Sequence, residues 1–357
     1  MRFPEFSGEW KKCKLGDLCN VLMCKRILVS QTNTEDGVPF YKIGTIGSTP
    51  DAYISKELFD DYKVKYNYPR KGEVMITCAG TVGKCVVYDG EDAYFQDSNI
   101  VWIDNPTQYI SNGFLFHLLS KVDWRKLNST TIIRIYNDDL RNLKMSYPRK
   151  EEQQKISHLL SLLDERIATQ NKIIEKLQSL IKGLAAQLTQ SGTPNIRLCD
   201  CLECHSSTLQ ENCVSVTGSY PVYGATGLIG YTNNYAYNGE SILIVKDGSG
   251  VGSLSYVNDH FSVIGTLNYL TAKENYSILY LYYALMAFNF TPYITGMAIP
   301  HIYFKDYGKA KLFYPSIEKR IRIASLLHNI EQKLVVEQNL VISLSTQKSY
   351  LLRMLFI

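Results

Sequence analysis

The chain carries one helical pattern twice, and this repeat limits its fold more than any other feature of its 357 residues. Tyr147-Pro148 opens the first stretch, and Tyr314-Pro315 opens the second. In both stretches apolar residues recur at the a and d positions of a heptad, as in helices that pack in a coiled coil. Each helix would run about 50 Å at roughly 1.5 Å per residue, far longer than an ordinary globular helix. The residues expected at this helix-packing and subunit-interface face are Ile156, Leu160, Leu163, Ile167, Gln170, Ile174, Ile323, Leu327, Ile330, Leu334, Glu337 and Val341.

The two copies also share a polar residue at an inner position. Gln170 and Glu337 occupy the same a step, with the same separation along the chain as the two Tyr-Pro pairs. A buried polar residue at an a position commonly fixes register and partner choice at some cost in stability. This agreement favours a true repeat over the alternative of two unrelated surface helices.

The segments before the helices repeat more faintly. In the first copy, a glycine-containing turn at residues 80–83 follows a strand-like run at 73–78. In the second copy, residues 248–252 follow a strand-like run at 241–246 in the same way. Short alternating runs broken by Gly, Asn and Asp indicate mixed strands and turns. We therefore expect an α+β chain with a β-rich unit before each long helix.

Two further matches support this repeat. Residues 38–41, Val-Pro-Phe-Tyr, resemble residues 220–223, Tyr-Pro-Val-Tyr. When Gly83 is aligned with Gly252, Asn99 falls on Asn268. We therefore expect these two asparagines to occupy equivalent places in the two units.

Composition excludes some classes of protein and leaves others open. The N-terminal sequence has no apolar segment of signal-peptide length, and no apolar run is long enough to span a membrane. We therefore expect a cytoplasmic protein without a membrane partner, whose nine cysteines are reduced thiols. The net charge of +4 permits nucleic-acid binding without requiring it, since compact DNA-binding modules are usually more basic.

Short motifs that look like enzyme signatures do not fit on closer comparison. Residues 80–84 resemble a phosphate-binding loop, but the spacing is two residues short and Cys85 replaces the required Ser or Thr. Residues 248–252 resemble a dinucleotide-binding loop, but residues 253–257 have a strand pattern, so no helix N-terminus follows to hold phosphate. A β-hairpin is the better interpretation there. Residues 104–107, Asp-Asn-Pro-Thr, lack the second proline of an amino-methyltransferase motif.

One cysteine-rich segment has metal-ligand character. It contains Cys199, Cys201, Cys204, His205 and Cys213. The spacing is irregular, and no second pair of ligands follows to close a tetrahedral zinc site. We expect reduced cysteines packed in a strand and loop here, and no bound metal.

The proline-headed heptad helices, the two β-rich units and their repetition along the chain together resemble the specificity subunit of type I restriction-modification enzymes. The resemblance covers the whole chain in order. The family's helix-entry pattern appears as Pro148, Glu152, Gln153 and Ile156, and its second-domain pattern resembles residues 220–227. At the second helix, Lys319-Arg320 replaces the Glu-Gln pair, which leaves the contacts at that helix entry open.

This resemblance implies an α+β fold of two tandem β-rich target-recognition domains separated by long antiparallel coiled-coil helices, with an internal pseudo-two-fold repeat. The expected boundaries are 1–147 for the first recognition domain, 148–190 for the central helix, 191–314 for the second recognition domain and 315–357 for the distal helix.

The resemblance also implies a function. Each recognition domain would read one half of a bipartite, asymmetric site in double-stranded DNA, while the helices act as a spacer and dock two methyltransferase subunits. Restriction and translocase subunits would complete the complex. S-adenosylmethionine, ATP and Mg would bind to those partners, so this chain would bind no cofactor and carry no catalytic residue.

The residues expected to face DNA are polar side chains on loops that the repeat places equivalently. They are Lys42, Thr45, Thr81, Lys84, Ser98, Asn99 and Arg134 in the first unit, and Thr226, Lys246, Ser249, Thr266, Asn268, His301 and Lys305 in the second. Lys and Arg contact phosphates or guanine, and Asn pairs with adenine. The alternative for each residue is an ordinary solvated loop residue or turn former, and a structural role fits His301 equally well.

Two other functions stay open from the residues alone. A coiled-coil scaffold whose β units bind protein would lack the steep loss of DNA affinity with salt that phosphate contacts produce. A single-chain DNA methyltransferase with a degenerate catalytic domain would bind S-adenosylmethionine directly.

Overall fold

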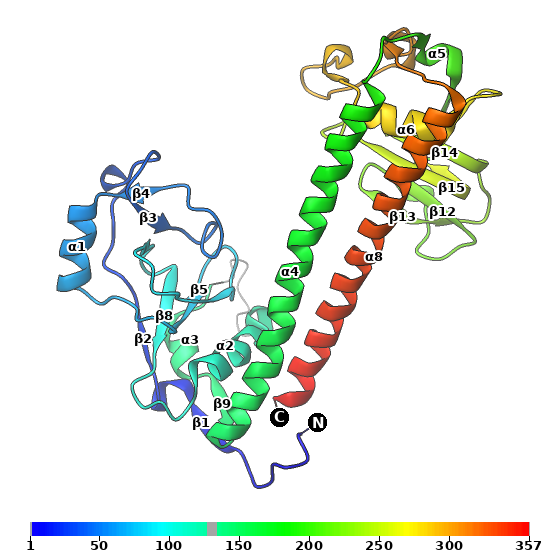
Figure 1. Ribbon diagram of the computed structural model, residues 1–357. Helices are drawn as coiled ribbons and strands as arrows, with labels where there is room; N and C mark the ends of the chain where they lie inside the picture. Colours follow the sequence, from blue (N-terminus) through cyan, green and yellow to red (C-terminus); the bar gives the residue numbers. More distant parts are fainter. Residues whose placement is uncertain (1, 127–133, 357) are drawn as a thin grey trace. The chain divides into compact units, whose positions relative to one another are not determined.

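The computed structural model describes residues 2–126 and 134–356 (Figure 1). The chain forms two compact units: residues 1–169 with 341–357 make unit 1, and residues 170–340 make unit 2. The helices α4 (Lys150–Thr189) and α8 (Ile317–Leu355) each contribute one part to each unit. Each helix begins two residues after its proline, because proline suits an extended lead-in but not a helix interior. The two long helices predicted from the heptads are thus confirmed.

The described residues of unit 1 form three small sheets. The strands β1 (Lys11–Lys14) and β9 (Lys144–Tyr147) pair with each other in antiparallel register. A four-stranded sheet has the order β2 (Asn20–Leu22), β8 (Ile100–Asp104), β5 (Val74–Thr77), β6 (Cys85–Val87). A three-stranded sheet has the order β4 (Tyr53–Ile54), β3 (Val38–Tyr41), β7 (Tyr94–Phe95). Its shorter helices are α1 (Lys56–Lys65), α2 (Asn112–Lys121) and α3 (Asn137–Arg141).

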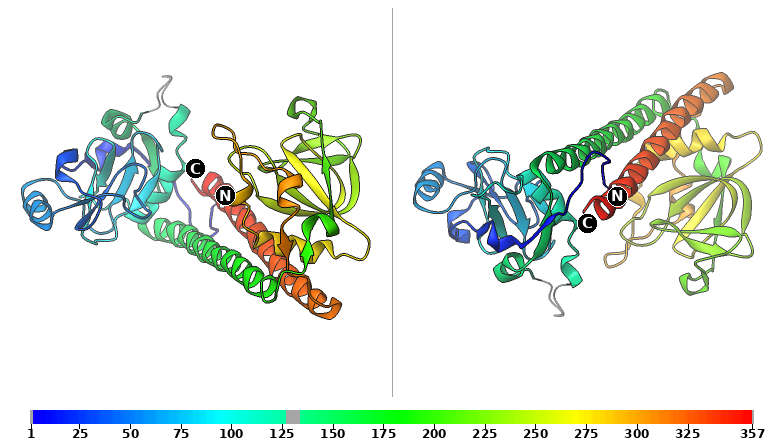
Figure 2. Two further views of the ribbon diagram at one scale, coloured as in Figure 1. Left: turned by 90° about the horizontal axis from the view of Figure 1, so that it is seen from above. Right: turned by 90° about the horizontal axis from the view of Figure 1, so that it is seen from below.

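The core of unit 1 joins its central sheet to the long helices. Strands β5 and β8 are buried along their whole length, and α2 packs against β5 and β6. Ile156 and Leu160 of α4 enter the same cluster as Leu355 at the end of α8. The start of α4 therefore packs against the end of α8, so the two segments run antiparallel within this unit (Figures 1 and 2).

Unit 2 is built on one larger sheet. Its order is β11 (Leu202–Ser206), β16 (Leu267–Ala272), β14 (Tyr237–Val245), β15 (Leu254–Val263), β12 (Tyr220–Gly224), β13 (Gly227–Thr232). A separate pair joins β10 (Ile196–Arg197) to β17 (Lys311–Leu312). The shorter helices are α5 (Leu198–Cys201), α6 (Ile278–Met286) and α7 (Phe304–Tyr307).

Helix α6 lies between this sheet and the long helices. Its sequence, Ile-Leu-Tyr-Leu-Tyr-Tyr-Ala-Leu-Met, is apolar on every side, as expected for a helix that is covered all round. It shares a core cluster with Ala185 of α4 and with Ile323 and Leu327 of α8. The end of α4 thus meets the start of α8, and the segments again run antiparallel within the unit.

The two units repeat the same pairings, which confirms the tandem α+β fold class. Strand β3 pairs in parallel with β7, as β12 does with β15. The hairpin predicted around residues 248–252 is present as the antiparallel pair β14 and β15. Among the described residues, no helix is both long and apolar enough to cross a membrane.

The structure corrects one equivalence of the sequence repeat. Asn99 O accepts a hydrogen bond from Cys78 N (2.7 Å), and Thr266 O accepts one from Lys246 N (3.0 Å). Asn99 therefore corresponds to Thr266, and its predicted match with Asn268 is wrong. Asn268 pairs with Ile244 inside the sheet, in the place that Val101 takes opposite Ile76 in unit 1. The offset between equivalent residues is not constant along the chain, because the loops of the two units differ in length.

Candidate nucleic-acid interface

Four separate segments of unit 1 meet where β3, β5 and β7 end. Ile135 N donates to Cys78 O (2.9 Å), which attaches the segment at 134–136 to the hairpin loop between β5 and β6. Thr81 of that loop donates through its hydroxyl to Ile43 O (3.1 Å) in the loop after β3. Ser98 and Asn99 lie in the turn between β7 and β8, beside Cys78. One edge of the unit therefore gathers loops that lie far apart in the sequence.

All seven residues predicted to face DNA in unit 1 lie on these four segments. The Lys84 ammonium donates to Ile46 O, so this lysine also fixes the loop after β3. Thr45 shapes the same loop, because its hydroxyl accepts from Lys42 N (3.1 Å). Arg134 Nη2 lies 3.5 Å from Ser98 O. The structure thus brings the predicted set together, while contact with DNA stays a prediction.

Both units need glycine in the hairpin loop. Gly83 has φ +84°, and a Cβ there would lie 2.2 Å from Trp124 Cδ1. Gly252 has the same φ of +84° and lies against Phe290, where a Cβ would meet the Cβ of Phe290 at 3.3 Å. Only glycine adopts this backbone without strain so close to an aromatic side chain. The aromatic residue supports the loop in both copies.

Unit 2 repeats the arrangement with different side chains. Ile302 N donates to Lys246 O (2.9 Å), the counterpart of the Ile135–Cys78 contact. Ser249 lies exposed on the hairpin loop, and Lys305 is exposed with its ammonium 5.1 Å from the centre of the Tyr303 ring. The structure therefore brings Lys246, Ser249, Thr266, His301 and Lys305 to one edge of the unit.

Two predicted residues of unit 2 have different surroundings. Thr226 is exposed in the turn between β12 and β13. Asn268 is buried within β16 and accepts a hydrogen bond from the Ser206 hydroxyl (3.1 Å). We therefore leave Asn268 out of the DNA-facing set proposed below.

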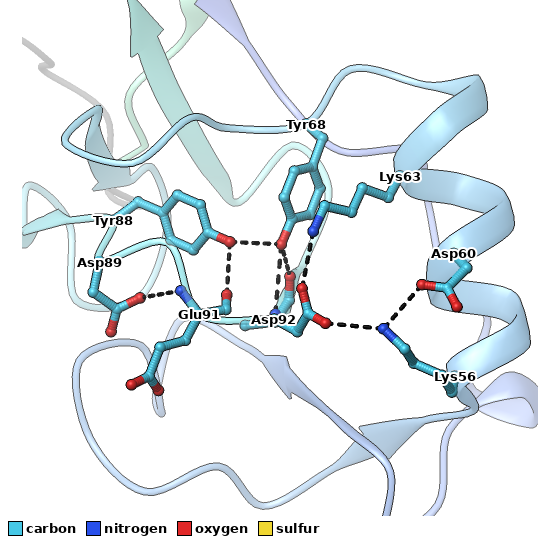
Figure 3. Close-up of polar contacts among 9 residues, drawn as sticks. Lys56, Asp60, Lys63, Tyr68, Tyr88, Asp89, Glu91 and Asp92 are labelled. Atoms are coloured by element: carbon cyan, nitrogen blue, oxygen red, sulfur yellow. Dashed lines mark hydrogen bonds and ion pairs between the residues drawn. The ribbon is translucent and has the colours of Figure 1, made fainter.

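Helix α1 of unit 1 carries three lysines and three acidic residues, and two of its lysines pair with acidic groups of the same unit (Figure 3). Asp92 accepts hydrogen bonds from Lys63 and Lys56, both at 2.9 Å, and Lys56 also pairs with Asp60 at 3.0 Å. The hydrogen bond from Lys63, followed by that from Lys56, lowers the pKa of Asp92. The Tyr68 and Tyr88 hydroxyls lie 2.8 Å apart beside this group. These contacts hold α1 to the turn before β7, so its lysines serve the fold.

The long helices place every predicted packing residue in a buried or half-buried position. Within unit 2, the Gln170 amide donates to the Glu337 carboxylate, which also pairs with Lys333. Within unit 1, Lys348 of α8 pairs with Asp164 of α4. The role of these faces in binding other subunits stays a prediction.

Sequence reasoning missed two further contacts of the long helices. Arg2 binds Glu152 through two hydrogen bonds of 2.7 and 2.6 Å, and Glu152 is only 1% exposed. Glu331 accepts from the hydroxyls of Tyr282 (2.9 Å) and Tyr283 (2.7 Å). The helix-entry motif drew attention to Glu152, but its partner lies at the start of the chain. The Tyr-Tyr pair in an apolar helix was the only available signal for the second contact.

The cysteine-rich segment is built into the edge of the unit 2 sheet. Burial raises the pKa of Cys201 to about 12 and that of Cys204 to about 11. His205 lies on β11 with its Nε2 2.9 Å from the Thr271 hydroxyl. No group of three or more His, Cys, Asp or Glu side chains in the described part of the chain is arranged to hold a metal. These residues make strand and loop contacts.

Comparison with known proteins matches this architecture. The family model described as Type I restriction modification DNA specificity domain matches residues 7–179 and 196–344, one copy in each half of the chain. A Haemophilus influenzae protein, named as a putative type I restriction enzyme specificity subunit, is 48% identical over 172 residues, or 48% of this chain and 44% of that protein. The EcoprrI specificity subunit of Escherichia coli is 28% identical over 112 residues, or 31% of this chain and 28% of that protein. The aligned segments thus span less than half the length of these relatives.

Solved structures share the fold at low sequence identity. The S subunit of a type I restriction-modification system from M. genitalium has a TM-score of 0.69 at 18% identity, covering 98% of this chain and 96% of that one. A second chain has a TM-score of 0.52 at 16% identity, covering 97% of each chain. Its structure is described as showing complex assembly and conformational transition of the type I system.

Proposed function

The chain belongs to the type I restriction modification DNA specificity family, and from this premise we propose that each of its units reads one half of a bipartite, asymmetric DNA site. The observation that carries the proposal is the repeated loop edge. In both units a glycine hairpin loop is joined by backbone hydrogen bonds to a turn before the next strand and to the segment at 134–136 or 301–303. Two such edges on one chain suit two separate half-sites.

The side chains on these edges divide into two kinds of contact. Exposed lysines, such as Lys84 and Lys305, suit phosphate oxygens, which position a protein on the duplex without reading its sequence. Arg134 and His301 occupy the same place in the repeat and suit base edges, where hydrogen-bonding side chains distinguish base pairs. In this proposal the sequence preference at each half-site comes from the contacts with base edges.

The long helices complete the proposed function. They set the gap between the half-sites and dock two methyltransferase subunits, and restriction and translocase subunits join this complex. S-adenosylmethionine, ATP and Mg bind to those partners, which carry out the chemistry, while this chain supplies recognition. The family membership and the likeness to a structure described as showing complex assembly support this division of roles.

The test is to purify this chain with a type I methyltransferase subunit from its own genome and to map the adenines that the complex methylates. A split, asymmetric site with methylation in both halves is the expected result. Affinity for a duplex that carries this site should fall steeply with salt, because lysines that contact phosphates release counterions. An interaction scaffold would instead give no methylation, and any DNA binding would be weak and independent of sequence.

A further inference from the structure

Unit 2 carries an apolar loop tip beside its polar loop edge. Met297 is fully exposed and Ile299 is 65% exposed, on the loop at residues 295–301. Ile294 and Tyr303, on either side of the loop, are 37% and 49% exposed. Four large apolar side chains therefore gather on one short exposed segment, and such clusters mark contact sites.

The backbone fixes the shape of this loop. Thr295 N donates to His301 O (2.9 Å), and His301 N donates to Thr295 O (2.8 Å), which closes the two stems. Gly296 has φ +90°, and a Cβ there would lie 2.3 Å from Ile299 O. The turn therefore requires glycine, and the tip is held in place before any partner binds.

The same hydrogen bonds place the tip next to the proposed DNA-facing residues. Gly248 N donates to Pro300 O (2.9 Å), which ties the loop to the hairpin that carries Ser249. His301 Nδ1 donates to Ile299 O (3.2 Å), so in the neutral ring Nε2 is left as a hydrogen-bond acceptor. The edge thus presents aliphatic groups and an acceptor side by side.

We propose that Met297 and Ile299 read a thymine through its C5 methyl group in the half-site of unit 2, an assignment that rests on the DNA-reading function proposed above. In the major groove, an A·T pair presents the thymine methyl together with the adenine N6 donor. An aliphatic tip beside an acceptor matches that pattern. The lysines of the same edge contact phosphates, which do not identify a base pair.

The test compares the full chain with its Met297→Ala/Ile299→Ala variant, each in complex with the methyltransferase subunit. Mapping of methylated adenines should show relaxed preference at one T·A position in one half-site, with the other half unchanged. Replacing that thymine by deoxyuridine removes only the methyl group and should weaken binding of the unaltered complex by about three- to fivefold. The variant complex should bind the two duplexes equally. Val64→Ala is the matched control, because Val64 is an exposed aliphatic residue on α1 in unit 1.

Three results would overturn the assignment while leaving the proposed function standing. They are unchanged site preference in the variant, relaxation at a G·C pair, and equal binding of thymine and deoxyuridine duplexes by the unaltered complex. Absence of any split methylated site in the unaltered complex would refute the proposed function itself, and this assignment with it.

Discussion

The two units hold the start of their long helices by different side chains at the same repeat position. In unit 1, Gln153 donates to Pro148 O and Tyr109 O, both at 2.9 Å, and accepts from Ser111 N at 2.7 Å. In unit 2, the equivalent residue of the repeat is Arg320, which donates to Pro315 O at 2.8 Å. Its guanidinium carbon lies 4.1 Å from the centre of the Tyr314 ring.

The comparison shows that the same backbone N–H needs a hydrogen-bond acceptor in both units, while different side chains provide that acceptor. Ser111 and Ser277 cap equivalent helices, α2 and α6, and each leaves its own N–H to be satisfied. Gln153 accepts that N–H in unit 1, and the Tyr314 hydroxyl accepts it in unit 2 (2.8 Å). Although Lys319-Arg320 replaces the family's Glu-Gln pattern, the start of α8 is still held by hydrogen bonds, which Arg320 and Tyr314 make in place of a glutamine.

The largest effect is expected from removing the buried amide. Gln153→Ala leaves three backbone groups without their partner and should lower the free energy of unfolding of unit 1 by about 3 kcal/mol. Arg320→Ala, the matched change, should cost unit 2 about 1 kcal/mol, because Arg320 is half-exposed and Tyr314 still binds Ser277 N. Hydrogen exchange of amides in each unit measures both values. Equal costs in the two units would contradict the comparison.

The next largest difference between the units is expected in how their stability changes as the pH falls. His117 is fully buried in unit 1, beside Ser161, Asp164 and Lys348, and burial lowers its pKa to about 4. His117 therefore becomes protonated near pH 6.5 in the unfolded chain but only near pH 4 in the folded unit. Stability from this group is complete above pH 6.5 and is lost as the pH falls toward 4, by on the order of 3 kcal/mol.

The repeat offers its own control for this effect, because the residue of α6 that corresponds to His117, counted from the equivalent caps Ser111 and Ser277, is Tyr283. Hydrogen exchange between pH 7 and 4.5 should show the loss in unit 1, and His117→Gln should reduce it. The same pH dependence with and without His117 would rule out this source.

The polar contacts between α4 and α8, Gln170 with Glu337 in unit 2 and Asp164 with Lys348 in unit 1, should differ less in their contribution to stability. Gln170→Leu leaves the buried Glu337 with Lys333 alone and should lower the stability of unit 2 by about 1–2 kcal/mol. Lys348→Met, which breaks the half-exposed pair with Asp164 in unit 1, should cost less than about 1 kcal/mol. The double change Gln170→Leu/Glu337→Leu should recover the loss, since an apolar pair often replaces a buried polar one without cost. A further loss in the double variant, measured by the same hydrogen exchange, would show that this layer stabilises the pairing.

The smallest effect is expected from a single exposed lysine. Lys305→Ala should weaken DNA binding by the complex a few-fold on every sequence and reduce the slope of log affinity against log salt by about one. Lys182→Ala on α4 is the matched exposed control and should leave the slope unchanged. A change in the methylated sequence after Lys305→Ala would mean that this lysine reads a base.

The parts of the fold that repeat were predictable, and the parts that break the repeat were not. Heptads mark α4 and α8 because long helices bury one stripe over many turns. Surface loops of the two units differ in length, so the number of residues between equivalent positions changes along the chain. For this reason Asn99 was matched with Asn268 in place of Thr266. The Arg2–Glu152 pair depends on tertiary contact, which no local pattern records. The sequence indicated which polar residues lie on the loop edge, but only the backbone hydrogen bonds of the structure show that these loops lie side by side.

The central claim is that each unit reads its own half of one DNA site, and the pair Arg134 and His301 tests it most directly. The measurement is a map of methylated adenines for three complexes: the unaltered chain, Arg134→Ala and His301→Ala. If each unit reads its own half, the unaltered chain gives a split asymmetric site, Arg134→Ala relaxes the preference in one half only, and His301→Ala relaxes it in the other half only. Relaxation of the same half by both variants, or of neither, would contradict it.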